Sequence, residues 1–110
     1  MVTLLSSTEF FRPKGDRVVR VVVLYGEAPD GRDYEEHAEL CRLVPGATFR
    51  HGPVFGAPMG EPAHRYFAEW EFADDESFKA AARSDEFMAT GKDAYKRGFP
   101  QPTVEFVSLA

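Results

Sequence analysis

From residue 18 onward, hydrophobic and polar positions recur with two distinct periods, and these periods predict a succession of strands and helices. Val18–Tyr25 is almost wholly β-branched or aromatic. Both of its alternating sets are apolar, which is typical of a central strand covered on both faces. His64–Phe72 alternates between a mainly aromatic face and a mainly charged one, and Thr103–Leu109 has the composition of a final strand.

A further strand is expected over Ala47–Phe55, at an edge of the sheet. Pro53 lies within it, and a proline cannot donate a hydrogen bond to a neighbouring strand. The Gly- and Pro-rich residues 56–62 then form a loop. Pairing of the two strands around this loop would place His51 opposite Ala68.

A first helix is predicted from a cap at Asp33 to a stop at Pro45-Gly46. Asp33 and Glu36 have the spacing of a capping box, in which side chains bond the free backbone groups of the first turn. The inner face of this helix would carry residues spaced i, i+3, i+4 and i+7. These are His37, Leu40, Cys41 and Val44.

A second helical region begins at Asp74, whose side chain is suited to capping and is followed by acidic residues that favour a helix N-terminus. Its inner side would carry Phe78 and Ala81. Ser84 has the character of a second N-cap, from which a helix would run to Gly98.

The predicted order is β-α-β-β-α-β, two split βαβ units that define an α+β, ferredoxin-like domain. Right-handed crossovers place both helical regions on one face of a four-stranded antiparallel sheet. We assign this domain to residues 18–110. Residues 1–17 contain a turn-like Arg12–Asp16 segment and are interpreted as an N-terminal extension.

The opposite face of the sheet has no predicted helix to cover it, although the central strand is apolar on both sides. An open apolar face usually marks an interface. Burial of two such faces against each other predicts a homodimer. The alternative is that the N-terminal extension covers the face within one chain.

Composition excludes several classes of protein. The 110 residues carry a net charge of -5, with no basic stripe of the kind that nucleic-acid or lipid-surface binding requires. The single cysteine, Cys41, rules out an internal disulfide, and we expect it to be inert packing in a cytoplasmic protein. No apolar run is long enough for a membrane span. We therefore expect no nucleic acid and no membrane as partners.

The chain resembles the EthD-like proteins of the dimeric α+β-barrel superfamily over about residues 18–110. The resemblance is carried by an ordered set of short motifs. These are Val21–Gly26, His37-x-x-Leu40 with Pro45-Gly46, Phe49–Val54, Tyr66 with Phe72, Asp74–Phe78, and Ser84-x-Glu86.

The resemblance implies protomers whose sheets pair into a barrel and a role in breaking down or tailoring ethers, aromatic compounds or polyketide-like molecules. His37 matches the family's histidine position. Asp93 matches an acidic position late in the second helical region and is a candidate partner for a histidine. Tyr34 is the candidate substitute for an aromatic residue that usually opens the first helix.

We expect His37 to act as a general acid or base, because an imidazole titrates near neutral pH. The alternative is a core histidine bonded to a strand carbonyl or an acidic neighbour. Tyr25 and Tyr66 are the candidate orienting donors. A ligand pocket would be lined by further residues, for which core packing is the alternative. These are Leu40, Trp70, Phe78, Asp93 and Phe99.

Two other sets of polar residues are candidates for chemistry. Glu69 and Glu71 share a strand face, where burial would raise their pKa values, or where Arg20, Arg50 or Arg65 would pair with them. His51 and His64 are not opposite each other, so we expect no metal site. No phosphate-binding loop is present, and we expect no cofactor.

Together these features predict a small homodimer that binds an aromatic or polyketide-like molecule and moves a proton, as in isomerisation, cyclisation or decarboxylation. The alternative hypothesis is a non-catalytic ligand carrier or an accessory protein of a multicomponent oxidation system.

Overall fold

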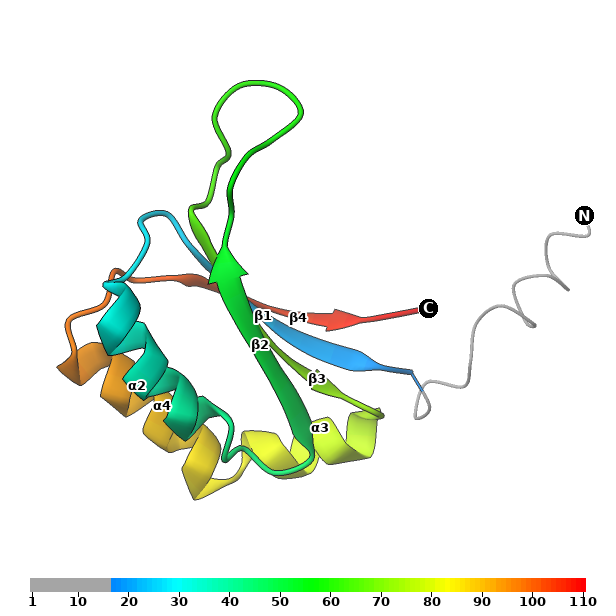
Figure 1. Ribbon diagram of the computed structural model, residues 1–110. Helices are drawn as coiled ribbons and strands as arrows, with labels where there is room; N and C mark the ends of the chain where they lie inside the picture. Colours follow the sequence, from blue (N-terminus) through cyan, green and yellow to red (C-terminus); the bar gives the residue numbers. More distant parts are fainter. Residues whose placement is uncertain (1–16) are drawn as a thin grey trace, which may run out of the picture.

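A four-stranded antiparallel sheet carries its helices on one face (Figure 1). The computed structural model describes residues 17–110, so the proposed extension lies outside the described residues except for Arg17. The strand order is β2-β3-β1-β4. The strands are β1 (Val19–Tyr25), β2 (Ala47–Pro53), β3 (Tyr66–Phe72) and β4 (Thr103–Ser108). The helices are α2 (Gly31–Cys41), α3 (Asp75–Ala82) and α4 (Asp85–Lys96). The predicted α+β ferredoxin-like fold is confirmed.

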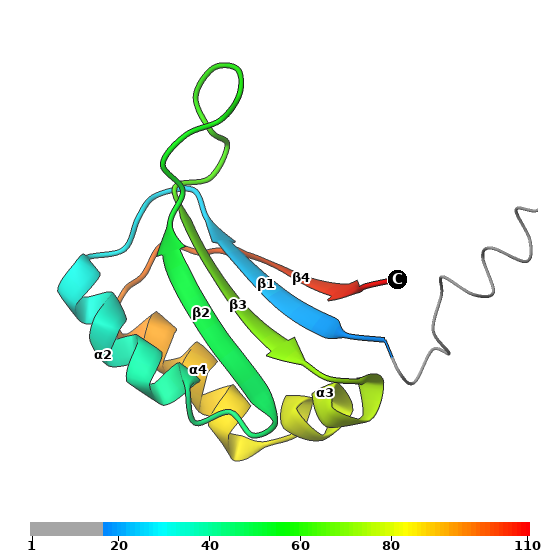
Figure 2. The same ribbon diagram turned by 45° about the vertical axis from the view of Figure 1, so that its right-hand side comes forward.

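The apolar strand β1 lies at the centre of the sheet, as its two apolar faces indicate. Val21 pairs with Trp70 of β3 on one side and with Phe106 of β4 on the other. The prediction that β2 is an edge strand is also confirmed, and His51 pairs with Ala68 as expected. Residues 54–65 join β2 to β3 in a long loop that projects away from the sheet (Figure 2).

The first helix begins earlier than the sequence pattern suggested. Asp30, not Asp33, is the N-cap, and its carboxylate accepts hydrogen bonds from the backbone amides of Arg32 and Asp33, each at 3.0 Å. Asp30 precedes the small Gly31 and has an extended ψ of 129°, which lets its side chain turn back over the first turn. The capping-box spacing at Asp33 was therefore misleading.

The later helix boundaries agree with the predicted caps. Asp74 accepts a bond from the Ser77 amide at 2.8 Å, and Ser84 accepts one from the Phe87 amide at 3.1 Å. At the end of α4, Gly98 has a φ of 71°. The Gly98 and Phe99 amides bond to carbonyls of the last turn, which closes a Schellman motif. This motif turns Phe99 back toward α2.

The core lies between the helices and the inner face of β1 and β3. It includes Val21 and Phe72 from the sheet together with several residues of α2. The buried residues of α2 are Tyr34, His37, Ala38 and Cys41. Leu40 was predicted on this inner stripe, but it is only partly buried, because the buried face runs through Tyr34, His37 and Cys41 and Leu40 lies at its edge.

The opposite face of the sheet is mixed rather than apolar. The register places Leu24 beside Phe67, and Val22 beside Glu69. Two arginines, Arg20 and Arg50, also lie on this face. In the described part of the chain, no helix covers it (Figures 1 and 2).

Candidate functional site

A cavity of about 410 Å³ lies between α4 and the inner face of β1, near β4. Its lining is almost entirely apolar. The side chains with polar groups are Tyr25, His37, Trp70 and Thr90. The other lining residues are Val21, Val23, Ala82, Phe87, Met88, Gly91, Ala94, Pro102 and Val104. Met88 and Val104 are each 50% exposed, which places the mouth of the cavity between α4 and β4.

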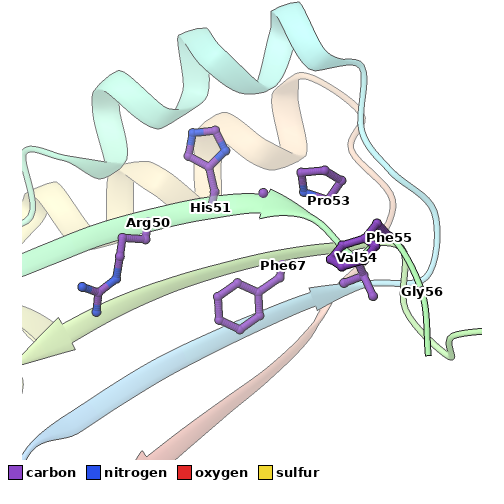
Figure 3. Close-up of a pocket in the computed structure, with 8 residues that line it drawn as sticks. Arg50, His51, Pro53, Val54, Phe55, Gly56 and Phe67 are labelled. Carbon is purple, nitrogen blue, oxygen red and sulfur yellow. The ribbon is translucent and has the colours of Figure 1, made fainter. Parts of the chain in front are cut away.

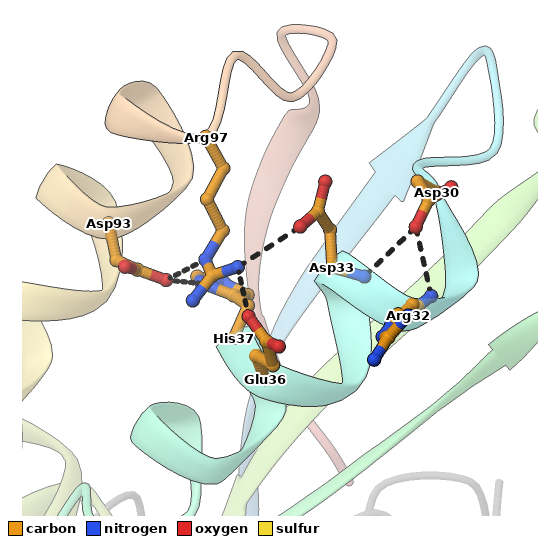
Figure 4. Close-up of polar contacts among 7 residues, drawn as sticks. All are labelled: Asp30, Arg32, Asp33, Glu36, His37, Asp93 and Arg97. Atoms are coloured by element: carbon orange, nitrogen blue, oxygen red, sulfur yellow. Dashed lines mark hydrogen bonds and ion pairs between the residues drawn. The ribbon is translucent and has the colours of Figure 1, made fainter.

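His37 is the imidazole side chain that lines this cavity, and it is only 3% exposed. Its Nδ1 lies 2.8 Å from Oδ2 of Asp93 on α4 (Figure 4). The expected pairing of Asp93 with a histidine is therefore present. Burial by itself would raise the pKa of Asp93, but hydrogen bonds from His37 and Arg97 outweigh that effect and lower it below its usual range.

The protonation state of this pair follows from the lowered Asp93 pKa. An ionised carboxylate only accepts hydrogen bonds, so Nδ1 of His37 must carry the proton that joins the two groups. In residues 17–110, no buried side-chain nitrogen or oxygen lacks a hydrogen-bond partner. Within these residues, the side-chain hydrogen bond of His37 is the one from Nδ1 to Asp93, so Nε2 is not a buried atom. Its Nε2 therefore reaches the open space of the cavity that the ring lines.

Arg97 holds the Asp93 carboxylate in this position. Its Nε donates to Oδ2 of Asp93 at 2.8 Å, and its Nη1 contacts Glu36 at 2.9 Å and Asp33 at 3.3 Å (Figure 4). Because Glu36 and Asp33 lie on α2 while Asp93 lies on α4, the guanidinium joins the two helices. Arg97 was not identified from the sequence, where a basic residue in a last helical turn has no distinguishing signal.

Tyr25 contributes the second polar group of the cavity. Burial raises the pKa of its phenol to about 12, with a hydrogen bond from Tyr34 acting in the opposite direction. The phenol is therefore a hydrogen-bond donor at neutral pH. Two of the expected site residues, Tyr25 and His37, are brought to the same cavity.

Tyr34 is the residue around which the neighbouring aromatic rings gather. Its ring lies 5.2 Å from that of His37, 5.5 Å from Phe99 and 5.0 Å from Tyr66, measured between centroids. Burial raises its pKa. The sequence offered two signals, its place near the start of the helix and its spacing three residues before His37, although the predicted inner stripe did not include it.

Tyr66 does not join His37. Its hydroxyl lies 2.7 Å from Nδ1 of His51, and Nε2 of His51 lies 3.2 Å from Oε1 of Glu35. Tyr66 is not among the residues that line the cavity, because its position next to the edge strand directs it toward β2. The expectation that Tyr66 orients a ligand beside His37 is therefore not supported by its position.

The remaining expected lining residues divide between the cavity and its surroundings. Trp70 lines the cavity, and its Nε1 donates to the Cys41 carbonyl at 2.9 Å, which ties β3 to the end of α2. Asp93 and Phe99 lie behind His37. Leu40 lies on the outer side of α2, and Phe78 packs between Phe72 and Phe106. Leu40 and Phe78 therefore do not line this cavity.

The carboxylates of β3 belong to an ionic network on the open face. Arg50 contacts Glu69 at 2.6 Å and Glu71 at 2.8 Å, and Arg20 contacts Glu71 at 3.0 Å. Hydrogen bonds from Arg20 and Arg50 lower the pKa of Glu71. The pairing alternative is thus correct for these two arginines, while Arg65 pairs with Glu61 instead.

A separate hollow of about 380 Å³ lies around the end of β2 (Figure 3). Its walls include Arg50 and Phe67 on the open side of the sheet and His51 on the helix side. It shares no lining residue with the cavity at His37.

Within residues 17–110, no group of three or more potential metal-ligating side chains comes together. Burial raises the pKa of the Cys41 thiol to about 12, so it is neither a ready nucleophile nor a thiolate ligand. No helix in that part of the chain is both long and apolar enough to cross a membrane.

Comparison with solved structures identifies the family. An ethyl tert-butyl ether D (EthD) family protein from Bacillus halodurans superimposes with a TM-score of 0.69 and 32% sequence identity, covering 84% of this chain and 99% of that one. The chain belongs to the EthD family, and the predicted resemblance is confirmed. A comparison with protein-family models finds no match, and a comparison with curated proteins finds none either.

More distant structures share the fold. A dimeric ferredoxin-like protein of unknown function from Jannaschia sp. has a TM-score of 0.61 at 18% identity, over 84% of this chain and 98% of that one. A hydroxynitrile lyase from Passiflora edulis has a TM-score of 0.63 at 14% identity, over 86% of this chain and 95% of that one. The fold is thus shared with a dimeric ferredoxin-like protein and with a hydroxynitrile lyase.

Proposed function

We propose that this protein binds a small neutral aromatic or polyketide-like molecule in the cavity at His37 and transfers a proton on it without a cofactor. The observation that carries this proposal is the buried His37 ring. Asp93 holds its Nδ1 proton, and its Nε2 reaches an otherwise apolar cavity.

The cavity lining sets the chemical class of the ligand. None of its side chains is an arginine, lysine, aspartate or glutamate. A carboxylate or phosphate would enter without a counter-ion, and burial of an unpaired charge is costly. A flat, uncharged ring system with one polar group fits the apolar walls and the two polar groups, Tyr25 and His37.

The same two residues define the proton transfer. Nε2 of His37 would accept a proton from an acidic C–H or O–H of the ligand, and Asp93 would stabilise the imidazolium that forms. The Tyr25 phenol would donate a hydrogen bond to the oxygen on which negative charge develops. Return of the proton to a different atom completes an isomerisation. Attack of the carbanion on a second carbonyl of the ligand, with the proton returned to the new alkoxide oxygen, gives a cyclisation, whereas the lining disfavours the carboxylate that a decarboxylation would consume.

We further propose that the protein works as a homodimer through its open sheet face, in the cytoplasm. The dimeric ferredoxin-like neighbour supports self-association. Leu24 and Phe67 supply apolar surface on this face, and Arg50 with Glu69 supplies matched charges. The unpaired Cys41 suits a reducing compartment.

Exchange of ligand protons for deuterium tests the catalytic part of the proposal. 2-Tetralone is a neutral bicyclic ketone with an acidic C–H beside its carbonyl. We expect the wild-type protein to accelerate exchange at that carbon in deuterium oxide, followed by proton NMR, and the His37→Gln variant to lose the acceleration. Binding of 2-tetralone without accelerated exchange would contradict proton transfer and favour the ligand-carrier hypothesis.

Native mass spectrometry of freshly purified protein tests the binding and assembly parts. A dimer that retains a small neutral mass is expected. A monomer at micromolar concentration would contradict the proposed interface.

A further inference from the structure

A second hollow adjoins the cavity at His37. It has a volume of about 500 Å³ and is lined by α4 and by the connector that follows it. Gly91, Ala94 and Pro102 line both spaces. We refer to the cavity at His37 as the inner chamber and to this second hollow as the outer chamber.

Gly91 marks the boundary between the chambers, and the protomer gives no folding reason for a glycine there. It lies within α4, where glycine destabilises a helix relative to alanine. A Cβ built at Gly91 meets no atom within 4 Å. Gly98 differs, because its φ of 71° requires a residue that tolerates the left-handed conformation. Gly91 is exposed, and the space beside it is open along the line where the two chambers meet.

We infer that the inner and outer chambers form one two-part binding site, with Gly91 and Ala94 as the threshold between them, for an elongated neutral molecule carrying a ring at each end. This inference rests on the proposed function and extends it to the shape of the ligand. The polar group that points to a ligand is Nε2 of His37. The ring is only 3% exposed, and its Nε2 makes no hydrogen bond within residues 17–110 and faces the inner chamber.

The outer chamber is suited to a second ring. Tyr95 and Phe99 provide aromatic surfaces, and Gln101 provides an uncharged hydrogen-bonding side chain. Tyr95 is 88% exposed and has little to pack against in the protomer, whereas a ring in the outer chamber would cover it. No charged side chain lines this chamber, which matches the inner one.

Two neutral phenols of different length test the inference. 2-Naphthol is compact, whereas 4-(benzyloxy)phenol carries a second ring on a short linker. Trp70 is the chain's single tryptophan and lines the inner chamber, so quenching of its fluorescence reports occupancy there. The wild-type protein is expected to bind the longer phenol more tightly.

The Gly91→Leu variant should narrow the threshold and weaken binding of 4-(benzyloxy)phenol by about tenfold, or about 1.4 kcal/mol, while 2-naphthol binding changes little. The Tyr95→Ala variant, at an exposed position that does not threaten folding, should also weaken only the longer phenol. Gly31→Leu is the matched control, because Gly31 is a helical glycine outside both chambers, and it should leave both affinities unchanged.

The outcomes separate this inference from the proposed function. If 2-naphthol binds but the longer phenol gains nothing, or if both variants leave its affinity unchanged, the two-part site is wrong and the inner-chamber function stands. If neither phenol quenches Trp70 in the wild-type protein, both are wrong. If Gly91→Leu alters the oligomeric mass and not phenol binding, the glycine serves a protein interface and the inference is overturned.

Discussion

The chemistry of the inner chamber depends on a single carboxylate, that of Asp93. An asparagine at this position can present its NH₂ group to Nδ1 of His37, which would place the ring proton on Nε2 instead. We expect Asp93→Asn to slow deuterium exchange into 2-tetralone by about tenfold or more, because the wrong tautomer cannot act as a base. Proton NMR of the ketone measures this rate.

The control for that variant is Glu86→Gln, which removes an exposed acidic side chain from the first turn of the same helix. Its exchange rate should equal that of the wild-type protein. An equal rate for Asp93→Asn would show that the carboxylate does not set the His37 tautomer.

The glycine within α4 and the glycine just after it should respond to alanine in opposite ways. Gly91→Ala is expected to raise the free energy of unfolding by about 0.5–1 kcal/mol, because helical glycine is entropically costly and the new Cβ meets no atom. Gly98→Ala is expected to lower it by about 1 kcal/mol or more, because a Cβ is disfavoured at a φ of 71°. Urea unfolding measures both, and a loss of stability in Gly91→Ala would contradict the open space beside it.

Single residues were predictable from the sequence where periodicity or the family motif fixed their direction. His37 and Tyr25 lie on strongly patterned elements, and both reach the cavity. Leu40 is only partly buried because the buried face of α2 is centred on His37, Ala38 and Cys41, and Leu40 lies at the edge of that face. Arg97 could not be found, because its role depends on a contact between α2 and α4 that no local pattern records.

At the scale of elements, His51 ties the edge strand β2 to α2 through Glu35 and to β3 through Tyr66. Burial lowers the pKa of His51 below its usual 6.5, although Glu35 acts in the opposite direction. The folded state therefore favours the neutral ring. The resulting stability is present above the usual pKa and is lost as pH falls through the lowered value.

We expect the wild-type free energy of unfolding to decline as pH falls below about 6.5, and His51→Gln to show a shallower decline. Urea unfolding at a series of pH values measures the two slopes. His64→Gln is the control and should retain the wild-type slope. Identical slopes for all three proteins would show that His51 does not link stability to pH.

The elements themselves were largely predictable, because strands and caps leave local signals. The apolar alternation of β1 and the caps Asp74 and Ser84 were located correctly. The start of α2 was missed because two aspartates, Asp30 and Asp33, both qualify as caps. The choice between them depends on backbone geometry before the helix, which the pattern does not contain.

At the scale of the whole molecule, the open face of the sheet is the surface through which we propose that two protomers form the homodimer. Leu24→Asp places a charge beside Phe67 on that face. If the face is the dimer interface, the variant should be a monomer by light scattering, with helix content unchanged by circular dichroism. Leu43→Asp is the control, because Leu43 is 62% exposed and lies outside the sheet, and it should remain dimeric. A dimeric Leu24→Asp protein would place the interface elsewhere.

The topology of the molecule followed from the order of its elements, but its cavities did not. Split βαβ units and right-handed crossovers leave one arrangement of helices over the sheet. The cavity exists because α4 stands away from β4, leaving Met88 and Val104 half exposed. That separation depends on the path of residues 97–102, where a pattern of hydrophobic positions carries no spatial information.

The most direct test of the central claim is long-range proton–nitrogen NMR of protein labelled with nitrogen-15 in its histidines, near neutral pH, with and without 2-naphthol. The His37→Gln variant assigns the His37 signals. We predict a proton on Nδ1, a free Nε2, and a large shift of Nε2 when the phenol binds. A proton on Nε2 in the free protein, or an Nε2 signal unmoved when Trp70 quenching shows saturation, would contradict the account.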